Sequence, residues 1–345
     1  MDVERVLLAQ PRGFCAGVEM AIKALAWMCR VFEPPVYCYH EIVHNKVVVD
    51  RFTGLGVVFV DDVGEVPPGA PLMLSAHGSA PEVVAAARAR GGVVVNAVCP
   101  LVTKVHHEMK VRASKGYTVV YVGHAGHEEA VGTMAVAPAA VRLVESEADV
   151  DALPDLSGDV ALLAQTTLSH DEWSGIRARA HDRFPDLWMP GRSDLCFATT
   201  NRQAALEAIA GDVDAVVVIG SANSSNTVAL EKVARATGCA RVHRVNAADE
   251  LPPDLSGTVG VTAGASAPEE LVRAVIARLA PRAGVEEVRV TDEDEYFPPP
   301  RELRDLLRVV ATGVAAAVGA PPDPSRPAPD DRALAASDAL EALAS

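Results

Sequence analysis

The sequence predicts an α/β fold of three similar units, each built on a small parallel sheet, in a pseudo-threefold (trefoil) arrangement around a central cavity. Three segments begin with a cysteine and pass into a helical pattern, at Cys15, Cys99 and Cys196, roughly one small domain apart. Within each segment, short apolar runs alternate with helical stretches, as expected of buried parallel strands. Similar βα units also recur by chance in doubly wound folds, but the equivalent cysteines favour a true repeat.

The repeat sets the expected boundaries of the units. The first unit covers residues 1–98 and includes an N-terminal strand, the second covers 99–195, and the third covers 196–300. In each unit two strands end in polar tips. The six segments that combine a strand with its tip are 36–45, 72–79, 118–129, 160–167, 215–226 and 259–266. From residue 301 to residue 345 we expect a last helix and then an Ala-rich and Pro-rich disordered tail.

The polar tips predict where a ligand binds. Ligands of parallel sheets bind outside the carboxyl ends of the strands, where these tips lie. Nearly all the tip side chains are neutral or switchable hydrogen-bond donors, and lysine is missing from the set. This composition suits a small diphosphate, held also by backbone N–H groups at helix N-termini. The candidate binding residues are His44, His77, His127, Thr166, Thr167, Ser224, Ser225, Asn226 and Ser266.

Charge and hydropathy exclude other classes of function. The net charge of −15 argues against nucleic acid, which requires clustered Lys and Arg. No run approaches the roughly 18 apolar residues of a bilayer span, and the N-terminus lacks the basic start of a signal peptide. We therefore expect a soluble, cytoplasmic protein with no membrane and no nucleic-acid partner.

The six cysteines do not form an expected disulfide framework, because a reducing cytosol keeps thiols available for metals or catalysis. Cys15, Cys99 and Cys196 lie at domain spacing, which suits an iron-sulfur cluster assembled between units. Buried structural thiols or a zinc site would also use three cysteines, and the repeat favours the cluster. Three ligands on a four-iron cluster leave one iron open as a Lewis acid. We expect the others, Cys29, Cys38 and Cys239, to be buried or incidental thiols.

Glu129 is the acid that we assign to catalysis. A buried carboxyl group beside a bound substrate oxygen has a raised pKa and can deliver the proton that releases water. We expect its neighbour Glu128 to face solvent, and Glu41 to be a plain surface acid rather than an orienting group.

The motifs of the chain closely resemble one family, the 4-hydroxy-3-methylbut-2-enyl diphosphate reductases of the non-mevalonate isoprenoid pathway. The resemblance runs from about residue 5 to residue 304. The motifs that carry it are 11–18 (PRGFCAGV), 40–45 (HEIVHN), 75–78 (SAHG), 99–106 (CPLVTKVH), 123–127 (GHAGH), 165–168 (QTTL), 196–203 (CFATTNRQ), 223–226 (NSSN) and 261–268 (VTAGASAP).

The resemblance implies a specific chemistry. It implies a 4Fe-4S cluster on three cysteines, with one open iron, at the centre of the trefoil; the cysteines are Cys15, Cys99 and Cys196. It implies that Glu129 delivers a proton and that Thr166 lies beside the hydroxymethyl group of the substrate. If Glu129 is not the proton source, we expect His127 or the diphosphate of the substrate to take that role. The diphosphate-binding groups then fall on His44, His77, His127, Ser224, Ser225, Asn226 and Ser266.

The reaction implied is the reductive dehydroxylation of (E)-4-hydroxy-3-methylbut-2-enyl diphosphate to isopentenyl diphosphate and dimethylallyl diphosphate, with electrons from a ferredoxin or flavodoxin.

The chain departs from the sequence pattern of the family after the second His of the His-Ala-Gly-His stretch. Many members have Pro, Glu, Val and Glu after the second His of the His-Ala-Gly-His stretch, whereas this chain reads Glu-Glu-Ala-Val at 128–131. Glu129 is kept, Glu128 replaces the proline and Val131 replaces the later acid.

Two alternatives remain open from the residues alone. One is an iron-sulfur lyase or condensing enzyme with the same threefold plan, such as quinolinate synthase, whose open iron binds carboxylates. The other is a cluster-bearing sensor that does no chemistry, which would need a surface for a partner. Protection of the protein by diphosphate against thermal unfolding would separate the carboxylate enzyme from the reductase, because the carboxylate enzyme should show none.

Overall fold

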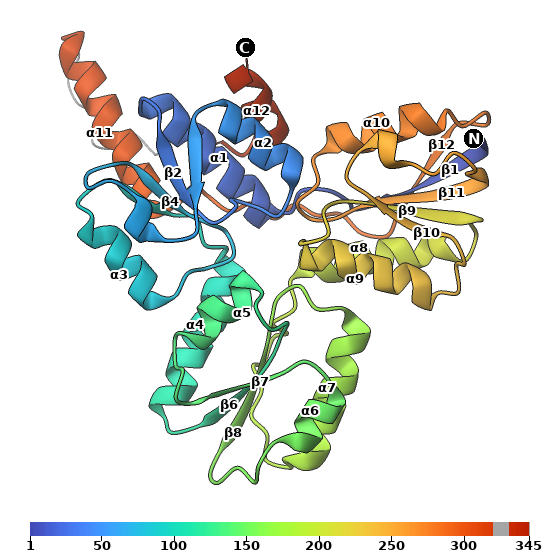
Figure 1. Ribbon diagram of the computed structural model, residues 1–345, viewed down its shortest axis with the longest axis horizontal. Coiled ribbons are helices and arrows are strands. Elements are labelled where there is room, and N and C mark those ends of the chain that lie inside the picture. The colour runs from blue at the N-terminus through green and yellow to red at the C-terminus, as the bar shows by residue number, and fades with distance from the viewer. Residues whose placement is uncertain (320–330, 345) are drawn as a thin grey trace.

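The structure is a computed structural model that describes residues 1–319 and 331–344. It has three α/β lobes around a common centre, as Figure 1 shows. Each lobe has its own sheet, of four, three and five strands, and every strand pair within the sheets is parallel. The expected threefold α/β fold is therefore confirmed.

The first lobe contains the four-stranded sheet, in the order β3-β2-β4-β5. Its strands are β2 (Val36–Tyr39), β3 (Val57–Val60), β4 (Leu72–Leu74) and β5 (Val94–Asn96). Its helices are α1 (Ala16–Val31), α2 (Lys46–Gly54) and α3 (Pro81–Ala89), with a short 3₁₀ helix at Val63–Glu65. Alternate strand residues face opposite sides, so Cys38 and Met73 pack towards α1 while Leu72 and Leu74 pack towards α3.

The second lobe contains the three-stranded sheet, in the order β7-β6-β8. Its strands are β6 (Thr118–Val122), β7 (Val141–Val144) and β8 (Val160–Ala164). Its helices are α4 (Pro100–Ser114), α5 (Glu128–Met134), α6 (Glu147–Ala152) and α7 (His170–Arg183). Strand β8 is buried along its whole length, because helices cover both faces of the sheet.

The third lobe contains the five-stranded sheet, in the order β10-β9-β11-β1-β12. Its strands are β1 (Asp2–Gln10), β9 (Ala215–Ile219), β10 (Val242–Val245), β11 (Ser256–Ala263) and β12 (Val285–Arg289). Its helices are α8 (Phe197–Ala210), α9 (Ser225–Ala236) and α10 (Glu269–Leu279), with a short 3₁₀ helix at Ala248–Glu250. Helix α10 covers one face of the sheet, and α8 and α9 cover the other (Figure 1).

Strand β1 departs from the expected unit boundaries. We expected it in the first unit, but it pairs with β11 and β12 in the sheet of the third lobe. Its buried residues Val6 and Leu8 pack in the core of that lobe. The chain therefore starts in the third lobe and crosses to the first lobe just before Cys15.

The C-terminal segment also differs from the expectation. The expected last helix is present as α11 (Arg301–Ala317), whose first turns pack on the first lobe through Leu303 and Leu307. After it, residues 331–344 are ordered rather than disordered, and α12 (Ala336–Ala344) packs against α1 (Figure 1). The rest of the expected disordered tail, residues 320–330 and 345, lies outside the described residues. Within the described parts of the chain, no helix combines the length and the apolar character needed to cross a bilayer.

Candidate functional site

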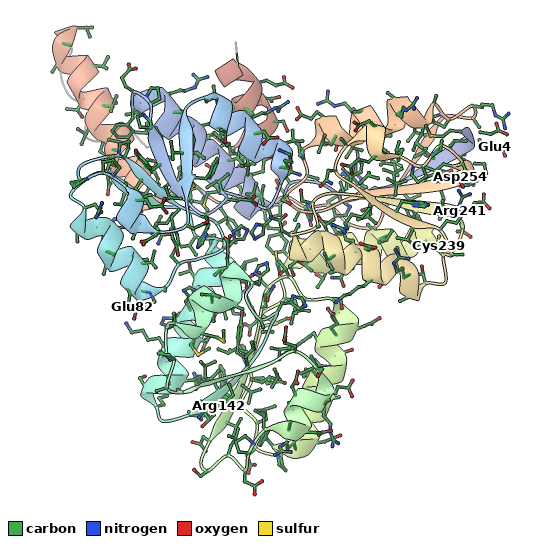
Figure 2. All side chains as sticks on the ribbon, viewed as in Figure 1. Glu4, Glu82, Arg142, Cys239, Arg241 and Asp254 are labelled. Carbon is green, nitrogen blue, oxygen red and sulfur yellow. The ribbon has the colours of Figure 1, made fainter. Side chains whose placement is uncertain are left out.

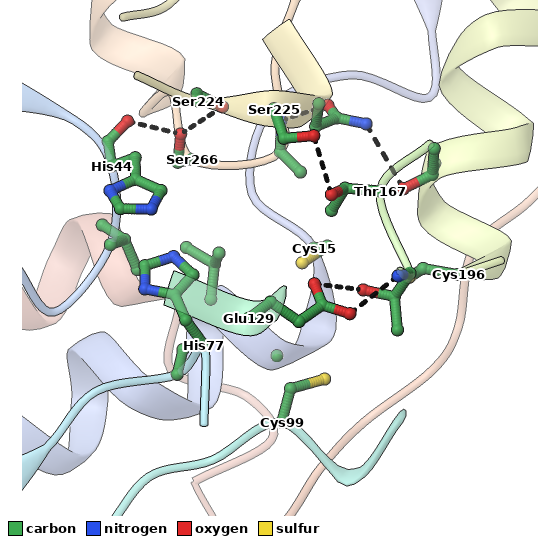
Figure 3. Close-up of a pocket in the computed structure, with 18 of the residues that line it drawn as sticks. Cys15, His44, His77, Cys99, Glu129, Thr167, Cys196, Ser224, Ser225 and Ser266 are labelled. Carbon is green, nitrogen blue, oxygen red and sulfur yellow. Dashed lines mark hydrogen bonds between the residues drawn. The ribbon is translucent and has the colours of Figure 1, made fainter. Parts of the chain in front are cut away.

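One pocket at the centre of the three lobes is lined by every candidate site residue that the sequence predicted. Figure 3 shows it, with His44 and Ser266 towards one end and Cys99 and Cys196 towards the other. The carboxyl ends of the strands point towards this centre, so the loops after β2, β4, β6, β8, β9 and β11 each contribute lining residues.

The three cysteines of the repeat share one structural position. Cys15, Cys99 and Cys196 are the N-cap residues of α1, α4 and α8, and each lies on the crossing from one lobe to the next. The N-terminus of a helix stabilises a thiolate, which is the form that binds a metal. Burial acts in the opposite direction and raises the pKa of Cys99 and Cys196. Such thiols release their protons when they bind a metal.

The space between the thiols depends on Gly17. A Cβ atom at Gly17 would lie 2.8 Å from Sγ of Cys99 and 3.9 Å from Sγ of Cys15. A glycine here keeps the region between the sulfur atoms open. Soft thiolate ligands that converge on an open space fit an iron-sulfur cluster.

The carboxyl group of Glu129 is the buried acid of the pocket, with only 2% of the residue exposed. The Thr166 N–H donates to Oε1 at 2.7 Å, and the Thr166 hydroxyl donates to Oε2 at 3.0 Å. Burial raises the pKa of Glu129 to about 7, although both bonds from Thr166 oppose the rise. Glu129 can therefore hold or release a proton near neutral pH.

His127 is fixed in one neutral form. The backbone N–H of Glu129 donates to Nδ1 of His127 at 3.2 Å, so this nitrogen carries no proton and Nε2 carries the hydrogen. Burial, together with the nearby His77 and His44, lowers the pKa of His127 to about 3. His127 is thus a neutral hydrogen-bond donor rather than an acid.

His44 and His77 form a stacked pair, with ring centroids 3.9 Å apart and planes inclined by 11°. Nδ1 of His44 lies 3.2 Å from Oε2 of Glu41, and Nδ1 of His77 lies 2.9 Å from Oε2 of Glu128. The expectations for both acids were therefore wrong. The Glu128 side chain is only 22% exposed, and each acid binds a pocket histidine. Residue types give no indication of these contacts, because Glu128 meets His77 across loops of different strands and Glu41 meets His44 through the local turn after β2.

The hydroxyl groups of the pocket are linked to one another. The Thr167 hydroxyl and Nε2 of Gln165 donate to Oγ of Ser225 at 2.9 and 3.2 Å. The Ser266 hydroxyl donates to the backbone oxygen of His44 at 2.9 Å. The side chain of Ser224 caps α9, which directs the N-terminus of that helix towards the pocket.

Sequence reasoning missed one lining residue of this network, Thr199, whose hydroxyl accepts a bond from Nδ2 of Asn226 at 3.4 Å. Its position one turn after Cys196 was the available signal, because a residue three positions into a helix shares a face with the N-cap.

The other three cysteines lie away from the pocket lining. Cys29 is near the end of α1, Cys38 is fully buried in β2, and Cys239 follows α9 at the outer end of the third lobe, as Figure 2 shows. Burial raises the pKa of Cys38, and it raises that of Cys29 to about 11.

The comparisons with known proteins agree with this site. A sequence model of the LytB protein family matches residues 6–280. The chain belongs to the LytB family. A family member of Rhodopirellula baltica, named 4-hydroxy-3-methylbut-2-enyl diphosphate reductase, is 47% identical over 310 residues, covering 88% of this chain and 97% of the relative. One of the same name from Mycolicibacterium paratuberculosis is 48% identical over 308 residues, covering 87% and 92%.

Solved structures of LytB relatives share the fold. The structure of the E-1-hydroxy-2-methyl-but-2-enyl-4-diphosphate reductase from Plasmodium falciparum has a TM-score of 0.86 and 29% identity, covering 90% of this chain and all of that one. A structure of (E)-4-hydroxy-3-methyl-but-2-enyl diphosphate reductase, described as the terminal enzyme of the non-mevalonate pathway, has a TM-score of 0.59 and 29% identity, covering 80% and 99%. The expected resemblance is confirmed, and the lyase and sensor alternatives are not favoured.

Proposed function

We propose that this chain catalyses the reductive dehydroxylation of (E)-4-hydroxy-3-methylbut-2-enyl diphosphate to isopentenyl diphosphate and dimethylallyl diphosphate, the last step of the non-mevalonate pathway. The observation that carries the proposal is one pocket in which three converging thiols, a buried carboxyl group with a pKa of about 7 and a set of histidine, hydroxyl and amide groups lie together. The names of the LytB relatives support the same reaction.

The proposed cofactor is a 4Fe-4S cluster held by Cys15, Cys99 and Cys196. The support is the donor set of three thiols at helix N-termini and the open space that Gly17 preserves. When bound, such a cluster supplies one-electron transfer and an open iron that acts as a Lewis acid. We propose a ferredoxin or flavodoxin as the electron donor and a cytoplasmic setting, because free thiols persist in a reducing compartment.

The proposed role of the polar end of the pocket is to bind the diphosphate group. His44, His77 and His127 contribute ring nitrogens there, and Ser224, Ser225, Asn226 and Ser266 contribute hydroxyl and amide groups. Helices α2 and α9 begin at this end, with Asn45 and Ser224 as their N-caps. Helix N-termini stabilise anions, which compensates for the missing lysine and arginine.

The proposed role of Glu129 is to hold and deliver a proton. Removal of the hydroxyl group takes two electrons and two protons, breaks one C–O bond, forms one C–H bond and releases water. Thr166 binds both oxygens of Glu129 and keeps the carboxyl group fixed in the pocket, with Thr167 beside it. A fixed acid with a pKa near the working pH is suited to protonate a leaving hydroxyl group.

The test is an anaerobic assay of the reconstituted protein with reduced ferredoxin or a chemical reductant, with both products quantified. We expect turnover in the wild type. Cys15→Ser, Cys99→Ser and Cys196→Ser should lose the iron and nearly all turnover, whereas Cys239→Ser should keep both. A wild-type protein with bound iron and sulfide that releases neither product would contradict the proposal.

A further inference from the structure

Two carboxylates contact the stacked histidines of the pocket. Glu128 accepts from Nδ1 of His77 at 2.9 Å, and Glu41 lies 3.2 Å from Nδ1 of His44. Glu41 also accepts from Nδ2 of Asn223 at 2.9 Å. Each histidine therefore has one ring nitrogen committed to an acid, and the other, Nε2, is left for a ligand in the pocket that both rings line.

Both acids are ionised near neutral pH. The hydrogen bond from His44 is the main cause of the lowered pKa of Glu41. For Glu128, burial raises the pKa, but the hydrogen bond from His77 and the charges of His77, His44 and His40 together prevail and lower it. An ionised carboxylate only accepts hydrogen bonds, so Nδ1 of each histidine must carry the hydrogen.

This tautomer has a consequence for a diphosphate ligand. A neutral imidazole with hydrogen on Nδ1 presents a bare lone pair at Nε2, and the oxygens of a diphosphate anion also present lone pairs. The two repel each other unless Nε2 gains a proton. His127 has the opposite arrangement, because Nδ1 accepts from a backbone N–H and Nε2 already carries hydrogen. His127 can donate to a phosphate oxygen without taking up a proton.

We propose that Glu41 and Glu128 are positioning residues that couple diphosphate binding to proton uptake by His44 and His77. The inference rests on the proposed binding of diphosphate in this pocket. In the step, a proton moves from solvent to Nε2 of each ring, the ring becomes an imidazolium between its carboxylate and the ligand, and no electrons move. A pocket lined without lysine or arginine gains its positive charge when the anion arrives.

The groups around the pair explain why the protons arrive with the ligand rather than before it. Burial, followed by the nearby His77, lowers the pKa of His44, so two stacked imidazolium rings are unfavourable in the empty pocket. The other titratable groups that line the pocket beside the pair are His127, at 5.5 and 6.1 Å between ring centroids, and Glu129. On the far side, His40 lies 3.8 Å from Glu128 and 3.3 Å from Asp61.

An alternative is that Glu128 weakens diphosphate binding rather than supporting it. A carboxylate this close to the diphosphate site could simply repel the anion, in which case its removal would tighten binding at every pH. The positioning role predicts a pH-dependent change instead. In Glu128→Gln, the amide can donate to a bare Nδ1, so His77 can carry its hydrogen on Nε2 and bind the anion without a proton.

The experiment is calorimetric titration of anaerobic, iron-loaded protein with inorganic diphosphate between pH 6 and 8, in buffers of different ionisation enthalpy. Any change in the protonation of diphosphate itself is common to the wild type and the variants, so the difference in proton uptake between them reports on the protein. Relative to wild type, Glu128→Gln and Glu41→Gln should each take up about one proton fewer, which flattens the pH dependence of Kd by about tenfold per pH unit. At pH 6 each variant should bind about tenfold more weakly than the wild type, near pH 7 the affinities should be about equal, and at pH 8 each variant should bind about tenfold more tightly.

The controls are matched. Glu82→Gln, an exposed acid on the outside of α3, should behave as wild type (Figure 2). Glu128→Pro suits the first position of α5 and should reproduce the loss of proton uptake without disturbing the helix. The titrations contain a chelator, because His44, His77 and Glu128 have ligand atoms within 4.8 Å of one another and could hold a metal ion.

The outcomes separate the two proposals. Wild-type proton uptake in Glu128→Gln, or tighter binding of that variant at both pH values, would overturn the positioning role even if the enzyme is active. Absence of diphosphate binding by the wild type would overturn both the pocket and this inference. A wild type without turnover that still binds diphosphate with Glu128-dependent proton uptake would overturn only the proposed reaction.

Discussion

At the scale of single residues, the pocket combines two carboxyl groups one position apart with opposite environments. Glu129 faces Thr166 and is almost completely buried, whereas Glu128 faces His77 and His40. Desolvation prevails at Glu129 and raises its pKa, while histidine contacts prevail at Glu128 and lower its pKa. Neighbouring residues at a helix N-terminus thus provide one protonated and one ionised group at the same pH.

Glu129→Gln should bind inorganic diphosphate normally but turn over at least about a hundredfold more slowly, within the usual range for a lost general acid. In the wild type, turnover should fall as pH rises through about 7, where the carboxyl group loses its proton. The pH profile of kcat, measured with a chemical reductant, checks both points. Near-normal turnover of the variant would assign the proton to another source, and Glu82→Gln is the control.

Glu129→Gln should also stabilise the folded state, and only at high pH. The pKa of Glu129 rises from 4.5 to about 7 on folding, so the folded state resists ionisation that the unfolded chain permits. The resulting destabilisation is absent below pH 4.5, grows between pH 4.5 and 7 and is complete above 7. Glu129→Gln should therefore raise Tm by a few degrees at pH 8 and leave it unchanged near pH 4.5. An equal gain in Tm at pH 4.5 and at pH 8 would contradict this account.

Gly17→Ala should lose more than about half of the bound iron, because the added methyl group overlaps Sγ of Cys99 in a packed site. Iron and sulfide analysis after anaerobic reconstitution measures the effect. Gly54→Ala is a matched control on α2, since a Cβ atom there meets nothing within 4 Å. Full cluster loading of Gly17→Ala would show that the cluster does not occupy this space.

At the scale of secondary-structure elements, the C-terminal segment completes the first lobe. Nζ of Lys23 in α1 donates to the backbone oxygens of Asp331 and Leu334 at 3.2 and 3.1 Å, and it lies 3.7 Å from the Asp331 carboxylate. The Ala336 N–H donates to Glu19 at 2.7 Å. A buried lysine is costly unless it is paired, and the segment adds these acceptors to Glu19 of α1, which lies 3.8 Å from Nζ of Lys23.

Truncation after residue 330 should lower the free energy of unfolding by roughly 3 kcal/mol, from lost hydrogen bonds to Lys23 and lost burial of Leu340. Denaturant unfolding of the iron-loaded protein measures it. Asp331→Asn keeps α12 in place and should cost less than the truncation. An unchanged unfolding midpoint in the truncated chain would show that this packing contributes nothing to stability.

At the scale of the whole molecule, the three site cysteines lie where the chain passes between lobes. Arg202 strengthens one crossing: it is fully buried and donates to the backbone oxygens of Gly13 and Phe14, just before Cys15. Lys104 strengthens another through Asp194, at 3.1 Å, just before Cys196. A cluster bound by the three thiols would join the three lobes in one more place.

Removal of the cluster should therefore loosen the lobes relative to one another rather than unfold them. Limited proteolysis of the iron-free protein should cut first near the crossings, around residues 96–99 and 190–196. Small-angle scattering should give a larger radius of gyration, while the secondary structure measured by circular dichroism stays unchanged. Reconstituted protein is the control, and identical digestion of both forms would contradict the prediction.

The sequence was sufficient to predict the fold class and the lining of the pocket, because strands, turns and N-caps depend on local residue patterns. It did not predict the place of β1, whose partners β11 and β12 lie more than two hundred residues away in the chain. Apolar alternation shows that a strand is buried but not which strand lies beside it. Glu128 was misplaced for the same reason, since His77 comes from the loop of another strand, whereas the contact of Glu41 with His44 depends on the conformation of a local turn.

The position of β1 also matters while the protein is being made. Strand β1 leaves the ribosome long before its partners, because β11 begins at Ser256 and β12 begins at Val285. At roughly 5–20 residues per second, the nascent strand waits for some tens of seconds with its apolar side chains uncovered. The middle lobe, by contrast, draws its whole sheet from one continuous stretch of chain. We expect the growing chain to depend on chaperones, and cofactor insertion to begin only after β12 has been synthesised.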